Sequence, residues 1–435
     1  MANKVEIVSR EVVKPSCPTS QDLSIYKLSF LDQFAPAAYM PLLLFYPVDG
    51  DYNDSKVENK SQVLKTTLSE TLSLFYPFAG RVKDNSIIEY NNDIGIEYLE
   101  AQVDCHLSQI LKKPDPDLLK QFLPVEVESS RAGVGPLLLV QASFFECGGL
   151  AIGISVSHKI GDASTVNTFI KAWSAIALRL EDEAMKPQYV LSSLYPPVNF
   201  PIKVPPMELG KSKTATRRYV FNSSNIIELR SIVASAALQQ PTRVEAVLAL
   251  IWKCATTASR INLGCSTRPS LMSQMVNIRK RVIPPLPNNS VGNLLGNFIA
   301  QEEENEIELQ SLVVKLRKGL EDYSNFEVKK LQEGDAFVSI SEAFKKIDDL
   351  LKNCEKDFYN CTSWCRFSFY HADFGWGRPK WVSISSLRIK NTIILMDTRD
   401  SNGIEAWLTL SEEDMALVEK NEELLAFATL NPSIY

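Results

Sequence analysis

Hydrophobic positions in the first half of the chain predict strands and helices in alternation. Two mainly apolar runs, at residues 137–145 and 150–157, predict buried strands. The apolar residues that follow, between 166 and 177, recur at the spacing of one helix face. An earlier helical pattern at residues 63–72 ends before Pro77, because proline cannot continue a helix interior.

The second half mixes the same two kinds of element. Thr242 and Glu245 have the spacing of a capping box, which predicts the start of a helix that continues through Trp252. Leucines and valines at residues 309–320 recur at helical spacing and predict another helix. The remaining predicted elements are strands at residues 381–385, 393–397 and 404–410, and a last helix that Ser411 opens.

Residues 186–213 lie between the two halves and contain six prolines. Because proline fixes φ and lacks a backbone donor, this stretch predicts an extended crossover. The sequence therefore predicts an α/β protein of two comparable domains, each with a mixed sheet and flanking helices. The predicted divisions are residues 1–185, the crossover 186–213 and residues 214–435.

Composition excludes several classes of protein. Hydrophobic residues are 45% and charged residues 23% of the 435, which is typical of a globular chain. The net charge of −6 argues against nucleic acid or an anionic membrane as a partner. The longest apolar stretch, residues 34–47, is too short to span a membrane, and residues 1–17 do not resemble a signal peptide. The eight cysteines are scattered without CxxC spacing, so a cytoplasmic protein with reduced cysteines is expected.

Histidine is scarce, and one of the three histidines stands where a catalytic group is easiest to place. His158 follows a predicted strand, and Asp162 lies four residues further on, at the start of the predicted helix. A neutral imidazole is the usual general base near pH 7, and loops at strand ends present reactive side chains. Two structural interpretations stay open, because His158 can be a packing residue and Asp162 can be a helix N-cap.

Other motifs are incomplete. Residues 210–212 end like a phosphate-binding loop, but a proline stands where the first glycine is needed. The GxSxG pattern of hydrolases and the GxGxxG pattern of dinucleotide-binding proteins are missing. No bound metal is expected, since no common zinc site has the spacing of Cys354, Cys361, Cys365 and His371.

One pentapeptide is far more specific than these motifs. It is Asp373-Phe374-Gly375-Trp376-Gly377, and a chance match to its five residues is rare. Together with the HxxxD pattern at residues 158–162, it resembles the plant BAHD acyltransferase family. Further matches at residues 75–81, 276–279 and 284–287 extend the resemblance over essentially the whole chain. Residues 143–149 and 157–162 most resemble vinorine synthase-like alkaloid acetyltransferases.

The resemblance implies a fold similar to chloramphenicol acetyltransferase, with an active-site channel between the two domains. It implies a monomer that uses an acyl-CoA as co-substrate and holds no permanent cofactor. His158 is the implied general base, which takes a proton from the acceptor hydroxyl as that oxygen attacks the thioester. Asp162 is implied to support the His158 loop by pairing with Arg279.

Further residues receive roles only from the resemblance. Thr362 and Trp364, in a matching Thr-Ser-Trp segment, and Asn293 are candidates for the oxyanion and acyl site. The segment from Asp373 to Gly377 is implied to be structural, with Asp373 in an ion pair away from the chemistry. Two departures from the family pattern are Ala163, where many relatives have glycine, and residues 290–293, where Ser-Val-Gly-Asn replaces Tyr-Phe-Gly-Asn.

The leading hypothesis is transfer of an acetyl group from acetyl-CoA to an alcohol of plant specialised metabolism, with an alkaloid as the favoured acceptor. A terpenoid alcohol, an aliphatic alcohol or an amine is an alternative acceptor, because the sequence shows no feature that distinguishes it from an alkaloid. A non-catalytic acyl-CoA-binding or interaction protein is an alternative of another class, and the intact His158 argues against it. A thioesterase is a third hypothesis, and acceptor-dependent release of CoA distinguishes a transferase from it.

Overall fold

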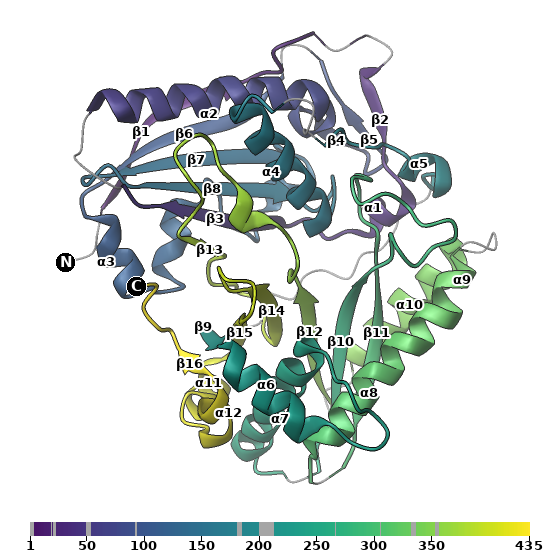
Figure 1. Cartoon of the computed structure of the whole chain (residues 1–435). Coiled ribbons are helices and arrows are strands. Elements are labelled where there is room, and N and C mark those ends of the chain that lie inside the picture. The colour runs from purple at the N-terminus through teal and green to yellow at the C-terminus, as the bar shows by residue number, and fades with distance from the viewer. Residues whose placement is uncertain are drawn as a thin grey trace.

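The computed structural model describes residues 4–18, 20, 23–48, 54–91, 94–180, 185–199, 213–265, 267–304, 306–331, 336–352 and 356–435. These residues form two large mixed β-sheets with flanking helices, and a small three-stranded sheet (Figure 1). The predicted α/β class, with a mixed sheet and helices in each domain, is confirmed.

The first sheet carries the strand that leads to His158. Its strands, in spatial order, are β1 (Val5–Val13), β6 (Ile96–Val103), β7 (Leu138–Phe145), β8 (Leu150–Ser157), β3 (Tyr39–Tyr46) and β13 (Trp381–Ser383). Only β6 and β7 pair in parallel. Every residue of β3, β7 and β8 is buried, which explains their mainly apolar sequences.

Two long helices cover one face of this sheet, α2 (Asp54–Leu74) and α4 (Ala163–Ala177) (Figure 1). The face of α4 that the periodicity predicted, including Val166, Phe169 and Trp173, is buried. Trp173 also ties the two helices together, because its Nε1 donates a hydrogen bond to Thr67 Oγ1 of α2 at 3.0 Å.

The second sheet has the order β11 (Leu295–Glu302), β10 (Ser270–Asn277), β12 (Asp357–Ser363), β14 (Thr392–Asp397), β15 (Ile404–Ser411), β9 (Thr214–Phe221) and β16 (Thr429–Leu430). The pairs β10–β12 and β12–β14 are parallel. The helices of this half are α6 (Ser223–Val233), α7 (Arg243–Leu263), α8 (Leu309–Asp322), α9 (Val328–Lys330), α10 (Ala336–Leu351), α11 (Glu412–Val418) and α12 (Glu422–Phe427).

The capping signals locate the starts of two of these helices correctly. Thr242 and Glu245 form the predicted reciprocal capping box of α7. Ser411 caps α11, but this is not the last helix, because Asn421 caps α12 and a short strand follows. An asparagine side chain that accepts from a backbone N–H starts a new helix as effectively as a serine.

The segment between β12 and β13 crosses from the second sheet to the first (Figure 1). Trp381 of β13 pairs with Phe45 at the edge of β3, and their rings stack at 5.3 Å. The division drawn from the sequence places this segment in residues 214–435, whereas its side chains pack into the core of the first sheet. The edge of β3 offers unpaired backbone groups, which β13 satisfies. Residues 200–212 of the proposed crossover lie outside the described residues.

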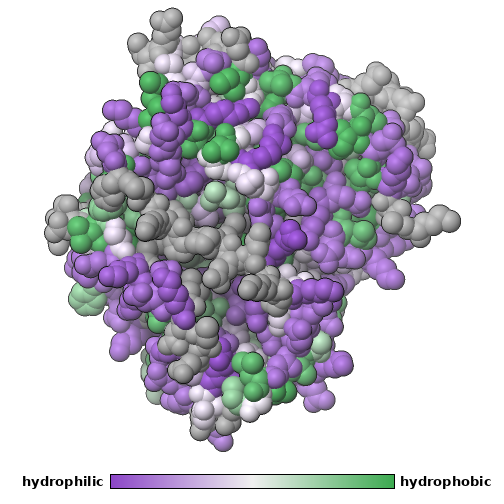
Figure 2. All heavy atoms as spheres, turned by 180° about the vertical axis from the view of Figure 1, so that it is seen from behind, coloured by the Kyte–Doolittle hydropathy of each residue, from purple (hydrophilic) through white to green (hydrophobic). Residues whose placement is uncertain are grey.

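The smaller elements are β2 (Ile25–Lys27), α1 (Phe30–Phe34), β4 (Arg81–Lys83), β5 (Ile87–Glu89), α3 (Leu107–Lys112) and α5 (Leu191–Leu194). The face of the molecule shown in Figure 2 is mostly hydrophilic, and its hydrophobic residues lie in small separate patches. None of the helices in the described ranges has the length and apolar character needed to span a membrane.

Candidate active site

His158 is the first residue after β8 and stands where the two domains meet. Its backbone N–H donates to the carbonyl of Ala38, the residue before β3, at 2.9 Å. The residues on both sides, Ser157 and Lys159, are buried, whereas His158 keeps partial exposure. The tight packing of its neighbours therefore fixes the backbone that carries the imidazole.

Asp162 ends the His158 loop and begins α4. Its Oδ1 accepts a hydrogen bond from the Thr165 backbone N–H at 3.0 Å, so it is the N-cap of that helix. Its Oδ2 accepts from the Leu294 backbone N–H, in the second domain, at 3.1 Å. The carboxylate faces these groups, and none of the described hydrogen bonds joins it to the imidazole of His158.

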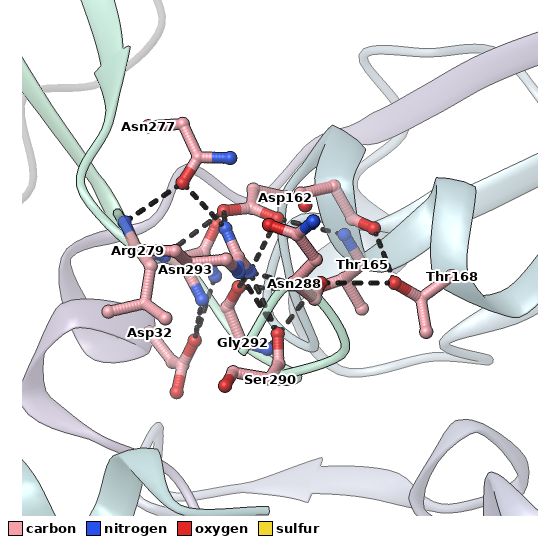
Figure 3. Close-up of polar contacts among 12 residues, drawn as sticks. Asp32, Asp162, Thr165, Thr168, Asn277, Arg279, Asn288, Ser290, Gly292 and Asn293 are labelled. Atoms are coloured by element: carbon pink, nitrogen blue, oxygen red, sulfur yellow. Dashed lines mark hydrogen bonds and ion pairs between the residues drawn. The ribbon is translucent and has the colours of Figure 1, made fainter. Parts of the chain in front are cut away.

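Arg279 follows β10 and is fully buried. Its two terminal nitrogens donate to the two oxygens of Asp162, at 2.7 and 3.0 Å (Figure 3). The same guanidinium also donates to the backbone carbonyls of Ser290 and Gly292, at 3.0 Å each. Arg279 therefore connects the His158 loop to the segment 290–294 of the second domain. The resemblance implied this pairing of Arg279 with Asp162.

Asn293 contacts His158 on both its backbone and its ring. The Asn293 Nδ2 donates to the His158 carbonyl at 2.7 Å and to the carboxylate of Asp32 at 2.9 Å. The Asn293 Oδ1 lies 3.4 Å from Nδ1 of the imidazole. The backbone N–H of Asn293 donates to the same oxygen of Asp32 at 2.8 Å.

These contacts fix the orientation of the Asn293 amide. Its NH₂ group faces two oxygens that only accept, so its own oxygen must face the ring of His158. Nδ1 of His158 must then donate, which leaves Nε2 of the neutral ring with a free lone pair. Both side-chain N–H groups of Asn293 are occupied by His158 and Asp32, so they are not available to donate to an oxyanion.

Burial lowers the pKa of His158 below its ordinary value of 6.5, because desolvation disfavours the charged imidazolium. The contact with Asn293 and the negative charge of Asp162 oppose this shift, whereas the positive charge of Lys159 adds to it. The ring is therefore neutral at pH 7, as a general base requires.

Asp32 and Lys159 are charged residues of this site that the sequence analysis missed. Asp32, in α1, is buried and accepts hydrogen bonds from Ser29 and Asn293 (Figure 3 shows the second contact). The ammonium of Lys159 is buried and donates to the carbonyl of Gln33 at 3.1 Å. The only sequence signal for Asp32 was its spacing from Ser29, which forms a capping box but says nothing of Asn293.

Thr362 and Trp364 lie at and just beyond the end of β12. Trp364 is buried and contacts the ring of Phe369, and the side chain of Thr362 is partly exposed. Within the described part of the chain, no hydrogen bond or ring contact joins either residue to His158. Their roles near the reacting atoms therefore remain a prediction.

The segment from Asp373 to Gly377 packs against the first domain. Phe374 contacts Trp173 of α4, with ring centroids 4.8 Å apart. In the described residues Asp373 has no ion pair, which corrects that expectation. Its Oδ1 instead accepts from the backbone N–H groups of Gly375 and Gly377, at 2.9 and 3.0 Å. A short carboxylate readily closes such a local turn on its own backbone.

Both departures from the family pattern leave the site intact. Ala163 is the first residue of α4, where helical backbone requires no glycine, and the crowded position is Gly161. A Cβ on Gly161 would lie 2.6 Å from the Thr165 side chain. Ser290 contacts Arg279 through its backbone carbonyl, so its side chain is not needed for that contact.

The cysteines give no sign of a metal site. Cys361 is buried, Cys365 is partly buried, and both are free thiols. Cys354 lies outside the described residues. Over the ranges that the structure covers, no group of three or more histidine, cysteine or acidic side chains could hold a metal ion.

Two domains of mixed sheet and helix, with a neutral histidine held where they meet, are the kind of structure expected of a CoA-dependent acyltransferase. The model of the Transferase family matches residues 3–425. The chain belongs to this family, the BAHD acyltransferases, and is an acyl-CoA-dependent acyltransferase.

Similar proteins cover the chain almost completely. An epi-neemfruitin B 7-O-acetyltransferase of Melia azedarach is 38% identical over 98% of this chain and 99% of its own. A stemmadenine O-acetyltransferase of Catharanthus roseus is 34% identical, over 97% of each chain. The crystal structure of vinorine synthase has a TM-score of 0.84 and 33% identity, and covers 99% of this chain and 100% of its own.

Proposed function

We propose that this enzyme transfers the acetyl group of acetyl-CoA to a hydroxyl group of a plant specialised metabolite, with an alkaloid alcohol as the favoured acceptor. Two of its relatives are named as O-acetyltransferases, and the sequence around His158 resembles the alkaloid branch of the family. One observation carries the mechanism: Nδ1 of His158 faces Asn293 Oδ1, so Nε2 is the nitrogen that is free to act as a base.

In the proposed reaction, Nε2 of His158 takes the hydroxyl proton as the acceptor oxygen forms a bond to the thioester carbon. The carbonyl oxygen becomes an oxyanion, and Thr362 is the candidate donor to it. When the C–S bond breaks, the imidazolium returns the proton to the departing CoA thiolate. General-base catalysis of this kind contributes about 10²–10⁴-fold, and the remainder comes from positioning and oxyanion stabilisation.

The proposal includes the organisation of the active protein. The chain acts as a cytoplasmic monomer, with the substrate channel between domains of residues 1–185 and 214–435. The seven cysteines in the described ranges are free thiols, as a reducing compartment requires. Light scattering coupled to size exclusion would test the monomer, and a mass near 98 kDa rather than 48.8 kDa would exclude it.

The test is a screen of the purified chain with acetyl-CoA and a panel of plant alcohols and amines, read by mass spectrometry. His158→Ala should lower turnover at least about 100-fold with an unchanged melting temperature. The matched control is His106→Ala, an exposed histidine away from the site, which should keep full activity. Unchanged activity of the His158 variant would end the general-base assignment. Release of CoA without any acceptor would favour a thioesterase, and transfer to amines alone would replace the alcohol as acceptor.

A further inference from the structure

We propose that Asp32 is a positioning residue for His158 and acts through Asn293, so that the three side chains form a carboxylate–amide–imidazole relay. The inference rests on the proposed function, because it names the group that orients His158, the proposed general base.

The carboxylate of Asp32 accepts several hydrogen bonds that favour its ionised form. Three N–H groups converge on its carboxylate, from Ser29, from the Asn293 backbone and from the Asn293 side chain, and the Ser29 hydroxyl donates as well. Burial raises the pKa of Asp32 above its ordinary value, because desolvation disfavours the carboxylate, and the hydrogen bonds from Ser29 and Asn293 oppose this rise by favouring the ionised form. None of the ion pairs in the described residues includes Asp32, so no direct cationic contact neutralises it.

Asn293 transmits this charge to the ring. Its Nδ2–H is polarised by Asp32, which increases the negative character of its own Oδ1. That oxygen faces Nδ1 of His158, so the relay favours the tautomer with hydrogen on Nδ1 and stabilises the imidazolium that forms during attack. The same amide holds the His158 carbonyl, so ring and backbone are oriented together.

Asp162 does not orient the imidazole in this way, although it is closer to His158 in the sequence than Asp32 is. Both of its oxygens are occupied by Arg279, and by backbone N–H groups of Thr165 and Leu294. The guanidinium also compensates its charge. The charged groups around His158 are then Asp162 and Lys159 on its own loop, Asp32 on α1, and Arg279 from the second domain behind Asp162.

The experiment is a titration of ¹⁵N-histidine-labelled full chain by NMR, without any substrate. The chain has only three histidines, so His106→Gln and His371→Gln spectra assign the His158 signals. In the wild-type protein we expect neutral His158 to carry its proton on Nδ1. In Asp32→Asn, loss of the negative charge should lower the His158 pKa by on the order of one pH unit and weaken the preference for Nδ1–H.

Ser29→Ala is the matched control, since it removes the hydroxyl that caps α1 and contacts Asp32 but leaves the carboxylate and Asn293 in place. It should lower the melting temperature, keep the proton of neutral His158 on Nδ1, and shift the His158 pKa much less than Asp32→Asn does. An equal shift in both variants, or no shift in Asp32→Asn, overturns the relay. If Asp32→Asn does not fold, the wild-type spectrum still decides, because a proton on Nε2 of the neutral ring contradicts the proposal.

The two proposals can fail separately. If the protein transfers no acetyl group but His158 titrates as expected, the relay is supported and the proposed function is contradicted. If acetyl transfer depends on His158 but the Asp32 variant leaves the pKa and tautomer of His158 unchanged, the proposed function is supported and the relay is contradicted.

Discussion

Arg279 and Asp162 form a bidentate ion pair between the two domains, and each side chain is only 1% exposed. Since both ions are desolvated, the loss of either one leaves the other charged, buried and unpaired. The pair fastens the His158 loop to the second domain, so its first consequence is for stability.

Asp162→Ala should lower the free energy of unfolding by about 3–5 kcal/mol and should also lower the rate of acyl transfer. Thermal melting checks the first effect and steady-state turnover the second. Arg179→Ala breaks a largely exposed pair with Glu70 and serves as the control, with a melting temperature close to that of wild type. A fully stable but inactive Asp162 variant would show that Asp162 acts on the chemistry directly.

Asp373→Asn should be tolerated, whereas Asp373→Ala should destabilise the protein by about 1–2 kcal/mol. The two backbone N–H groups of the turn share a single oxygen of Asp373, and an asparagine can supply that oxygen. Thermal melting of both variants is the measurement. If Asn is as damaging as Ala, then the charge of Asp373 matters, and an ion-pair role would return.

Lys159 should make stability depend on pH above neutrality. Burial lowers the pKa of Lys159 from 10.5 to about 8, because desolvation disfavours the ammonium. Between these values the unfolded chain holds the proton and the folded chain does not, so this residue's contribution to stability rises with pH by up to about 3 kcal/mol.

The measurement for Lys159 compares melting of wild type and Lys159→Met from pH 7 to pH 10. The advantage of the methionine variant should be largest at pH 7 and should shrink as the pH rises. Lys171→Met, at an exposed position of α4, is the control and should differ from wild type by a constant amount. A difference for Lys159→Met that does not change with pH would contradict the assignment.

No acetyl-enzyme should form when the protein is mixed with labelled acetyl-CoA alone. Burial raises the pKa of the Cys105 thiol to about 11 and that of Cys254 and Cys365 to about 12, so these thiols stay protonated and poorly nucleophilic. Intact-mass spectrometry of the acid-quenched protein checks this. A stoichiometric adduct that disappears when acceptor is added would establish a covalent route and would exclude direct transfer.

Much of the fold could be predicted from the sequence, because its signals are local. Apolar runs identified β7 and β8, and the capping residues Thr242 and Ser411 identified the starts of α7 and α11. The position of β13 could not be predicted in this way. Its short apolar sequence fits an edge strand of either sheet, and the path of residues 364–380 decides which edge it reaches.

The residues of the candidate site likewise fall into those found from local sequence motifs and those found only in the structure. His158, Asp162 and Arg279 were identified from motifs, whereas Asp32 was not, because 261 residues separate it from Asn293. Asn293 was one of three candidates for the oxyanion and acyl site, and the structure shows that its two side-chain N–H groups are already used. The sequence alone determined which elements form and which histidine is the candidate base, since backbone propensity and residue chemistry are local properties. Only the tertiary structure decided which nitrogen of that histidine is free, because the amide and carboxylate that orient it come from distant segments brought together by folding.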